Sequence, residues 1–301
     1  MKRMLFVYNP NAGKGIVKTK LSDIVDIFVK ADYEVVVYPT QCYHDALHKV
    51  AKMDDGYDIL VCSGGDGTLD EAVTGMMKRP PSKRIPIGYI PAGTTNDFAN
   101  SLHISKDVME AADAIVNGTP FACDVGRFNK DVFVYVAAFG LFTDVPYQTD
   151  QKLKNILGHS AYVLEGVKRL SHIPSYQIKI THGDTVIEDE FVVGLISNSR
   201  SIGGFQNISG KDVKYDDGEF EITLIKRPTK IKELQEILTS LLLEKVESQY
   251  VLTFKASEIL LESNEEIPWT LDGEFGGQHS IVRIRNKKQA LKIMVEQDVE
   301  E

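Results

Sequence analysis

Long apolar runs and paired cysteines are what this sequence lacks. Its 301 residues contain three cysteines, Cys42, Cys62 and Cys123, which are scattered and show no CxxC spacing. That pattern fits a reducing compartment and argues against a zinc site. The longest apolar run, residues 132–142, falls short of the roughly 18 residues that a membrane-spanning helix needs. The first apolar run, residues 4–8, is too short for the core of a signal peptide, so we expect a cytoplasmic protein without a transmembrane segment.

Positive charge is also in short supply, since 43 acidic residues outnumber 34 basic ones and give a net charge of −9. A nucleic-acid partner would need a basic face, so this balance predicts no nucleic acid as a partner. The hydrophobic share of 43% and the charged share of 26% are ordinary for a globular protein. A chain of this length can bury a substantial core, in one large or two medium domains, without disulfides.

Glycine is concentrated in the stretch Ser63 to Thr68 (SGGDGT), which speaks to function more directly than any other stretch. It follows the apolar run Ile59 to Cys62, which predicts a buried strand, and precedes a helix start at Leu69. Glycines let backbone amides approach a ligand closely, and a helix N-terminus directs unpaired N–H groups toward it. This order predicts a phosphate-binding loop. We also expect Thr68 and Glu71 to form a capping box that fixes the start of the helix.

Asp66 is the unexpected residue in this loop, because a carboxylate repels phosphate. Its presence makes sense if a divalent cation bridges it to the phosphates, so we expect Mg²⁺ near Asp66. The alternative is a tight Asp-Gly turn between two ordinary elements, and the loop alone leaves both interpretations open.

Two further turns of similar character follow strand-like runs. Residues Asn9 to Gly15 (NPNAGKG) precede a helical pattern, and Lys14 there could reach a nucleotide phosphate or be a solvated turn lysine. Residues Pro91 to Asn100 (PAGTTNDFAN) offer Gly93 for a turn. Asn96 and Asp97 in this stretch could cap a short helix, and Asp97 could instead orient a lysine or a metal-bound water.

Strand and helix patterns alternate through the first third of the chain. This alternation predicts an α/β fold with a parallel sheet between two helical layers, over residues 1–122. The glycine turns would then lie beyond the carboxyl ends of the strands, where open α/β sheets bind ligands. Residues 123–288 show hairpin-type strands, interrupted by helical patterns at 150–170 and 230–247, and predict a second, mainly antiparallel domain. Residues 289–301 could return to the first domain.

Two acidic turns lie in this second half. Leu271 to Glu274 (LDGE) places two carboxylates in a glycine turn after Trp269, the chain's single tryptophan. Asp216-Asp217-Gly218 is another Asp-Gly turn. Both could be plain hairpin turns, and both could bring carboxylates to a cation or to a reaction.

Four motifs, in this order and at these intervals, resemble those of the bacterial diacylglycerol kinase family of soluble lipid kinases: NPNAGKG at 9–15, GGDGT at 64–68, PAGTTNDFA at 91–99 and LDGE at 271–274. Sphingosine and ceramide kinases share the family's catalytic domain. GGDGT also occurs in NAD kinases and phosphofructokinases, whereas the four motifs together are specific and cover nearly the whole chain. The resemblance implies a three-layer α/β domain that binds ATP, a β-sandwich-like domain that receives a lipid, and an active site in the cleft between them.

The reaction that the resemblance implies is transfer of the γ-phosphoryl group of ATP to a lipid hydroxyl, giving phosphatidic acid if the lipid is diacylglycerol. Asp66 would hold a catalytic Mg²⁺ through water, and Glu274 would be the base that takes the hydroxyl proton. The residues implied at the nucleotide are Asn9, Pro10, Asn11, Ala12, Gly13, Lys14, Thr40, Gly65, Asp66, Gly67, Thr68, Leu69, Asp70, Glu71, Thr94 and Asp97.

The resemblance also implies a second, structural Mg²⁺ on the DDG turn. The side chain of Asp217 and the backbones of Lys214 and Glu219 would hold it, with Lys14 and Asp97 in the same charged network. Three positions depart from the family's pattern. Asp70 replaces the usual asparagine and adds negative charge beside the nucleotide, while Phe205 and Ser209 stand where glycine and proline are common.

Several alternatives stay open at this point. The substrate could be phosphatidylglycerol, a sphingoid or a polyprenol; the protein could also be an NAD-kinase-like metabolite kinase or a non-catalytic sensor of lipid or nucleotide. A lipid substrate suggests peripheral contact with the inner face of a membrane, and the resemblance makes a homodimer plausible. Clusters of basic residues, usually no more than a solvated surface, could support that contact: Lys78-Arg79 with Lys83-Arg84, Lys152 with Lys154, Lys226-Arg227 with Lys230, and Arg283 with Arg285 and Lys287-Lys288.

Overall fold

The computed structural model describes residues 1–140, 174–199, 201–202, 205–206, 213–243 and 248–296. The chain forms two compact units, the first of residues 1–135, 198–219 and 286–301, the second of residues 136–197 and 220–285. The chain therefore passes from one unit to the other four times. The domain boundary expected after residue 122 stays a prediction.

The first unit is built on a sheet in which five strands follow the order β15-β4-β3-β1-β2. β1 pairs in parallel with β2 and with β3, and β3 pairs in parallel with β4, so their carboxyl ends share one edge. The end of β15 pairs with β4 through Ile293 and Ile87. The strands of this unit are β1 (Lys2–Tyr8), β2 (Tyr33–Pro39), β3 (Ile59–Gly64), β4 (Ile87–Pro91), β5 (Thr119–Phe128), β6 (Asp131–Phe133), β10 (Ser201–Ile202), β11 (Phe205–Gln206) and the end of β15 (Glu274–Val295).

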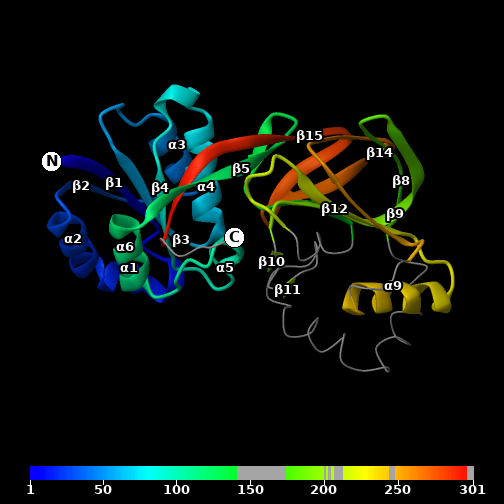
Figure 1. The fold of residues 1–301 in the computed structure, drawn as a ribbon, viewed down its shortest axis with the longest axis horizontal. Helices are drawn as coiled ribbons and strands as arrows, with labels where there is room; N and C mark the ends of the chain where they lie inside the picture. Colours follow the sequence, from blue (N-terminus) through cyan, green and yellow to red (C-terminus); the bar gives the residue numbers. More distant parts are fainter. Residues whose placement is uncertain (141–173, 200, 203–204, 207–212, 244–247, 297–301) are drawn as a thin grey trace. The chain divides into compact units, whose positions relative to one another are not determined.

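Helices cover both faces of this sheet (Figure 1). α2 and α6 lie on one face, and α3 and α4 lie on the other. The arrangement confirms the predicted three-layer α/β architecture. The helices are α1 (Ile16–Thr19), α2 (Leu21–Lys30), α3 (Asp45–Ala51), α4 (Asp66–Met77), α5 (Asp97–Ser101) and α6 (Val108–Asn117), with 3-10 turns at Ala12–Gly15 and Pro81–Lys83.

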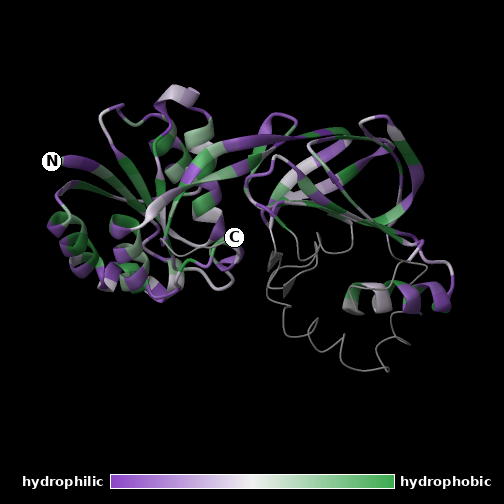
Figure 2. Ribbon diagram, in the orientation of Figure 1, coloured by the Kyte–Doolittle hydropathy of each residue, from purple (hydrophilic) through white to green (hydrophobic). Residues whose placement is uncertain are grey.

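The core of the first unit explains why these residues form these elements. β3 and β4 are buried along their whole length, as expected for central parallel strands with near-continuous apolar sequence. Phe6 of β1 packs edge-on against Phe28 of α2, with ring centroids 5.8 Å apart, and Ile115 of α6 joins the same core. Figure 2 shows the consequence, because the central strands are mostly hydrophobic and the helices turn one hydrophobic face to the sheet.

The second unit is antiparallel, with the strand order β13-β12-β9-β7-β14-β15. β8 pairs with both β9 and β14, and β7 pairs with the same two strands, so the sheet folds back on itself as in a β-sandwich. Trp269 and Phe139 pack edge-on inside, with ring centroids 4.9 Å apart. The elements are β7 (Val136–Gly140), β8 (Tyr176–His182), β9 (Thr185–Ser197), β12 (Phe220–Lys226), β13 (Val251–Ala256), β14 (Glu258–Leu271), the first part of β15 and helix α9 (Ile231–Leu243).

The α/β class with a second, mainly antiparallel β-sandwich-like part is thus confirmed, and some element boundaries differ. The sequence of residues 251–261 predicts one continuous strand, whereas the structure has two there, because the chain turns between β13 and β14. The helix predicted over 150–170 and the departure at Ser209 lie outside the described residues, whereas Phe205 lies in β11. None of the helices that the structure describes is long and apolar enough to cross a membrane.

Candidate active site

The predicted turns meet at the carboxyl edge of the first unit's sheet. The amide of Asn9 donates to the carbonyl of Ser63 at 2.9 Å, and the amide of Ala92 donates to the carbonyl of Gly64 at 2.7 Å. The amide of Thr40 donates to the carbonyl of Tyr8 at 2.9 Å. The turns after β1, β2, β3 and β4 therefore form one continuous edge, as the parallel order predicts.

Close backbone contacts hold these turns together, and two glycines allow them. A Cβ atom on Gly13 would lie 2.3 Å from the carbonyl oxygen of Ala92, and Gly13 has a φ of 56°. A Cβ atom on Gly93 would lie 2.6 Å from the Cα of Gly65. Side chains are excluded from both places, so the backbone itself lines this edge. That is the surface that a phosphate group needs.

The start of α4 corrects one prediction. Gly65 is the N-cap and makes no side-chain cap, so the expected capping box between Thr68 and Glu71 is wrong. The Thr68 side chain instead lies over Gly64, where a Cβ would approach its Oγ1 to 2.3 Å. The amide of Thr68 donates to the carbonyl of Gly65 at 3.0 Å. The helix N-terminus behind Gly65 and Gly67 remains open to an anion.

Glu71 has a structural partner that the sequence did not reveal. Its two carboxylate oxygens accept hydrogen bonds from the amides of His44 at 2.8 Å and Ala46 at 3.1 Å. Glu71 therefore caps α3, the helix after the Thr40 turn, rather than its own helix. Leu69 points into the core with 1% of its surface exposed, whereas Asp70 is half-buried.

Asp66 is half-buried, and one of its carboxylate oxygens is buried and unsatisfied. Its Oδ2 accepts a hydrogen bond from the amide of Asp97 at 3.2 Å. Its Oδ1 is buried and accepts no hydrogen bond from any described residue. Burial, followed by the charge of Asp97, raises the pKa of Asp66. A buried carboxylate with one unpaired oxygen is costly in the free protein and is suited to a cation.

Mg²⁺ fits this donor set. It prefers hard oxygen ligands and commonly takes one or two carboxylates, with waters and substrate phosphates completing its shell. Asp66 and the fully buried Asp97 would supply the carboxylates. No group of three or more His, Cys, Asp or Glu side chains suited to a metal occurs within the described ranges. A cation here would therefore depend on substrate oxygens or water.

The loop after β4 is held by Asn96, which the sequence places with Asp97 at the start of a short helix and which is the N-cap residue of α5. Its side chain accepts from the amide of Gly93 and donates to the carbonyl of Gly93, both at 2.9 Å. The Asn96 side chain therefore bonds to the loop rather than to its own helix. Tyr89, which the sequence did not single out, donates from its hydroxyl to the carbonyl of Gly64 at 3.2 Å.

The remaining residues expected at the nucleotide lie along the same edge. Asn9 accepts from the amide of Asn11 at 2.9 Å through its side-chain oxygen and so shapes the first turn. Lys14 and Thr94 are exposed, and Pro10 and Ala12 are half-buried. A charged network that joins Lys14 and Asp97 stays a prediction.

The DDG turn lies in the first unit, where Asp124 organises it. Asp217 accepts from the amide of Glu219 at 2.9 Å, and Lys214 is exposed. Asp124, 2% exposed, accepts from the amides of Gly218 and Gln289, each at 2.7 Å, and its burial raises its pKa. The sequence analysis missed Asp124, although a carboxylate inside an otherwise apolar strand was a signal. The roles of Asp217, Lys214 and Glu219 as metal ligands stay a prediction.

The LDGE turn lies in the second unit and divides its two carboxylates between two roles. Asp272, 4% exposed, accepts from the amide of Val136 at 2.9 Å, and its own amide donates to the carbonyl of Val136 at 2.9 Å. Glu274 is exposed at the start of β15. Asp272 therefore builds the turn, and the carboxylate of Glu274 faces solvent. Glu274 and Asp66 belong to different units.

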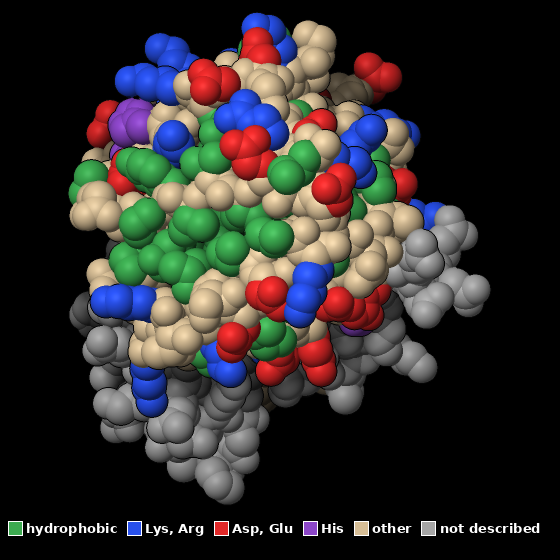
Figure 3. Space-filling model, turned by 90° about the vertical axis from the view of Figure 1, so that its left-hand side faces the viewer, with side chains coloured by type: hydrophobic (Ala, Val, Ile, Leu, Met, Phe, Trp, Pro, Cys, Tyr) green, Lys and Arg blue, Asp and Glu red, His purple; other side chains and the backbone are tan. Residues whose placement is uncertain are grey.

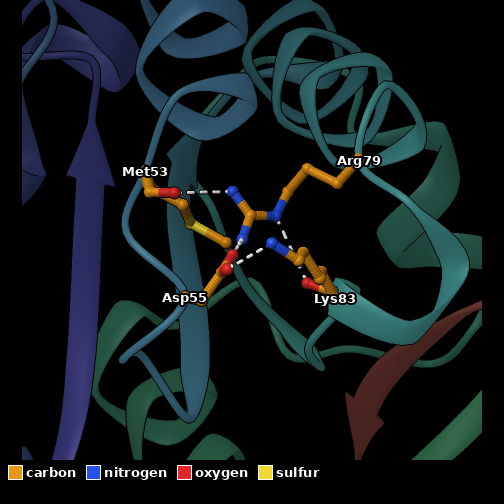
Figure 4. A network of polar contacts seen from close by, with 4 residues as sticks. All are labelled: Met53, Asp55, Arg79 and Lys83. Atoms are coloured by element: carbon orange, nitrogen blue, oxygen red, sulfur yellow. Dashed lines mark hydrogen bonds and ion pairs between the residues drawn. The ribbon is translucent and has the colours of Figure 1, made fainter.

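Two residues of one predicted basic cluster, Arg79 and Lys83, belong to a local network of polar contacts (Figure 4). Arg79 is 6% exposed and donates to the carbonyls of Met53 at 2.6 Å and Lys83 at 3.2 Å. Asp55 accepts from Arg79 at 2.6 Å and from Lys83 at 2.5 Å. Ion pairs also engage Lys226 with Asp189, Arg227 with Glu190, and both Arg283 and Arg285 with Glu258. Lys152 and Lys154 lie outside the described residues.

An α/β unit with backbone-lined turns at the carboxyl edge of its sheet, followed in part of the chain by an antiparallel sandwich-like unit, is the architecture to compare with known proteins. Residues 3–128 match the model of the diacylglycerol kinase catalytic domain, and residues 137–295 match that of the YegS C-terminal NAD kinase beta sandwich-like domain. The chain is 33% identical to a diacylglycerol kinase of Staphylococcus carnosus, an alignment that covers 99% of this chain and 96% of the relative. It is 33% identical to a diacylglycerol kinase of Bacillus subtilis, over 92% of this chain and 91% of the relative.

Solved structures agree with these matches. The crystal structure of a diacylglycerol kinase from Bacillus anthracis superimposes with a TM-score of 0.81 at 26% identity, covering 99% of this chain and 98% of that one. The chain belongs to the diacylglycerol kinase family. These relatives support a lipid kinase, as the four motifs indicated.

Proposed function

We propose that this protein transfers the γ-phosphoryl group of ATP to the hydroxyl of a lipid at a membrane surface, and that diacylglycerol is the lipid. The observation that carries the proposal is the edge where backbone-lined turns surround Asp66, a half-buried carboxylate with one buried, unsatisfied oxygen. The family membership supports the kinase class, and the named relatives support this lipid as the first to test.

The nucleotide would bind along the turns that follow β1, β2, β3 and β4. Amides of Gly13, Gly65 and Gly67, together with the N-terminus of α4, would contact its phosphates, because no Cβ blocks their approach at Gly13 and Gly65. Thr40 and Thr94 lie on neighbouring turns of the same edge and would contact the rest of the nucleotide. The exposed Lys14 would reach a phosphate as a mobile point charge.

Asp66 and Asp97 would hold the Mg²⁺ that accompanies ATP. When bound, this cation supplies positive charge to the phosphate oxygens, where negative charge develops during transfer. Binding of the cation would also remove the free-energy cost of the unpaired Oδ1 of Asp66. This gain is a physical reason for a carboxylate in a phosphate loop.

Glu274 would take the proton of the lipid hydroxyl as its oxygen attacks the γ-phosphorus. The bond from the γ-phosphorus to the bridging oxygen of ADP breaks in the same step, in line with the attack. An exposed carboxylate on a turn fixed by Asp272 can accept a proton from an incoming hydroxyl. That Glu274 of the second unit meets Asp66 of the first is part of the proposal.

The test is ATP turnover with Mg²⁺, comparing diacylglycerol in mixed micelles with phosphatidylglycerol, sphingosine, undecaprenol and NAD. Transfer of label from the γ-position into phosphatidic acid alone is expected. Label in another phospholipid would mean that a different lipid is the substrate, and the proposed mechanism would still hold. Turnover with NAD and with none of the lipids would contradict the proposal.

A further inference from the structure

Apolar side chains are exposed in different settings on the first unit. Figure 3 faces the side where β2 is the outermost strand, and it shows hydrophobic side chains gathered there. Val35 and Val37 of β2 are half-buried and pack against the core, so this surface follows from the fold. Tyr43 lies instead on the loop between β2 and α3, and 69% of its surface is exposed. Single exposed rings are common on proteins, so the setting of Tyr43 decides its meaning.

The loop of residues 40–44 has a fixed backbone. The amide of Gln41 donates to Oδ2 of Asp45 at 2.7 Å. The amide of His44 donates to Oε1 of Glu71 at 2.8 Å. The first bond closes the loop on the start of α3, and the second ties its last residue to α4. A side chain on a backbone that is already ordered can bind a ligand without the entropy cost of ordering the loop.

His44 adds a second ring to this loop. Its imidazole lies against the ring of Tyr43, with centroids 3.9 Å apart and planes at 30°. His44 has a φ of 62°, in the left-handed region, which few residues with a side chain adopt. Such a conformation persists where the surrounding structure holds it, and it recurs at ligand-binding sites. Both rings are exposed, so together they form one aromatic surface, which we call the aromatic pair.

The aromatic pair lies on the edge where the nucleotide would bind. Its loop follows β2, and at its start the amide of Thr40 donates to the carbonyl of Tyr8, the last residue of β1. At its end the loop is bonded to Glu71, which is less than two turns of α4 from Gly65. Those turns correspond to about 9 Å along the helix axis. A ribose and a base joined to phosphates near Gly65 can span a distance of this order.

We propose that the aromatic pair of Tyr43 and His44 is the surface on which the purine base of the nucleotide stacks. The inference rests on the proposed use of ATP and names the side chains that contact its base. Every nucleobase has a flat π-face, and stacking on an aromatic side chain contributes to affinity without reading the edge of the base. The pair is therefore expected to favour nucleotides over inorganic tripolyphosphate, rather than one purine over another.

The chemistry of the loop favours a base over the other partners of an exposed tyrosine. A membrane surface with anionic lipids would select lysines or arginines beside the ring. The loop is instead TQCYH over residues 40–44, with no lysine or arginine, and an aspartate follows it. The carboxyl edge of an open α/β sheet is where such folds bind small ligands, and the loop lies on this edge. We therefore assign the pair to a small heteroaromatic ligand.

The first experiment measures binding of ATP and of inorganic tripolyphosphate to the full chain by calorimetry, with Mg²⁺ and without lipid. Tyr43→Ala is expected to raise the dissociation constant for ATP about tenfold, because the stacking of one base is lost. The dissociation constant for tripolyphosphate should not change. His44→Asn keeps the backbone amide on Glu71 and tolerates the same φ, so a smaller loss of ATP affinity is expected.

Val29→Ala is the matched control. Val29 is 56% exposed on α2 and lies just before the start of β2, at the opposite edge of the sheet. Its substitution should leave both dissociation constants unchanged. If Tyr43→Ala binds ATP as tightly as the native chain does, the inference is overturned and the proposed function still stands. Equal weakening of ATP and tripolyphosphate overturns it as well, because the backbone of the loop would then be responsible. A native chain that binds no ATP contradicts the proposed function itself, and the inference with it.

A second variant guards against a Tyr43→Ala protein that does not fold. Tyr43→Trp retains an aromatic ring and adds a fluorescent reporter, while Trp269 is buried in the second unit and gives a constant background. A stacked base quenches indole fluorescence, so ATP is expected to quench the added emission and tripolyphosphate is not. The emission of the native chain with each ligand is the reference. If saturating ATP leaves the added emission unchanged, the base does not stack on this surface and the inference is wrong.

Discussion

Two pairs of carboxylates, Asp66 with Glu71 and Asp272 with Glu274, lie in different units and differ internally in the same way. In the first unit Glu71 accepts from the amides of His44 and Ala46, while Asp66 keeps an unsatisfied oxygen. In the second unit Asp272 accepts from the amide of Val136, while Glu274 is exposed. One carboxylate of each pair builds the local structure, and the other is the one to which we assign chemistry in our proposal.

The units differ in how the second carboxylate is held. Asp66 is half-buried at the start of α4, and this partial burial raises its pKa. Glu274 stands in solvent at the end of a tight turn. A group that receives a cation gains from a dry, fixed position, whereas a group that must meet an incoming hydroxyl needs access. The contrast between the half-buried Asp66 and the exposed Glu274 can be tested by substitutions at each residue.

The largest expected effect concerns turnover. Glu274→Gln should lower kcat about 10²- to 10⁴-fold, since it removes the proposed proton acceptor. Asp66→Asn should lower turnover on the order of 10²- to 10³-fold, because it removes charge from the proposed cation site. Both are measured as label transfer from ATP to lipid, with far-ultraviolet circular dichroism to confirm folding. Wild-type rates for Glu274→Gln would show that the proton acceptor lies elsewhere.

Within the LDGE turn, substitution of Asp272 should lower the free energy of unfolding more than substitution of Glu274. Asp272→Ala leaves the amide of Val136 without its acceptor and should lower the free energy of unfolding by about 1–3 kcal/mol. Glu274→Ala, two residues away and exposed, should change it by less than about 0.5 kcal/mol. Urea unfolding followed by tryptophan fluorescence suits the measurement, because Trp269 is buried nearby in β14. Equal losses for the two variants would remove the distinction between them.

Glu71 should behave as a positioning residue in the first unit. Glu71→Ala removes the cap of α3 and should cost about 0.5–2 kcal/mol of stability. It should raise KM for ATP severalfold with a smaller change in kcat, because the Thr40 turn precedes α3. Glu71→Gln retains one acceptor oxygen and should recover part of the loss. A kcat deficit as large as that of Asp66→Asn would instead indicate direct contact with the reacting groups.

The smallest expected effect is a pH dependence of stability at Asp66. Its folded pKa is raised, so its contribution to stability is present below the ordinary Asp pKa and is lost as pH rises through the folded value. Ionised Asp66 therefore destabilises the ligand-free protein near neutral pH. Asp66→Asn should raise the Tm there, and the gain should vanish below about pH 4. A Tm gain that is constant with pH would assign the effect to something other than this charge.

Much of the first unit could be predicted because its signals are local. Apolar runs followed by glycine turns gave the parallel strands, and the alternation of strand and helix placed the turns on one edge. The role of Glu71 could not be read in this way, since its partners lie 25 and 27 residues earlier on another helix. The T-x-x-E spacing of Thr68 and Glu71 is compatible with a capping box, but Glu71 instead makes a tertiary contact to α3.

The second unit was harder to predict because its strands are long and shared. β14 pairs with β7, β8 and β15, and its length of 14 residues includes register shifts that periodicity does not reveal. The role of Asp124 was not predicted for a related reason, because its partners Gly218 and Gln289 are 94 and 165 residues away. Contacts of this range depend on the order in which the chain returns to each unit.

That order of return has a consequence for synthesis on the ribosome. The first unit needs residues 198–219 for one amide partner of Asp124, and residues 286–295 for the strand beside β4 and for the second partner. When residue 135 emerges, most of this unit's sequence exists, but the edge of β4 is still bare and Asp124 is unpaired. The nascent N-terminal portion cannot reach its finished state before the last strand is translated, so it is exposed to chaperones and proteases throughout that interval. A shortened message that ends between residues 135 and 285 should therefore give an incomplete first unit rather than a small stable protein.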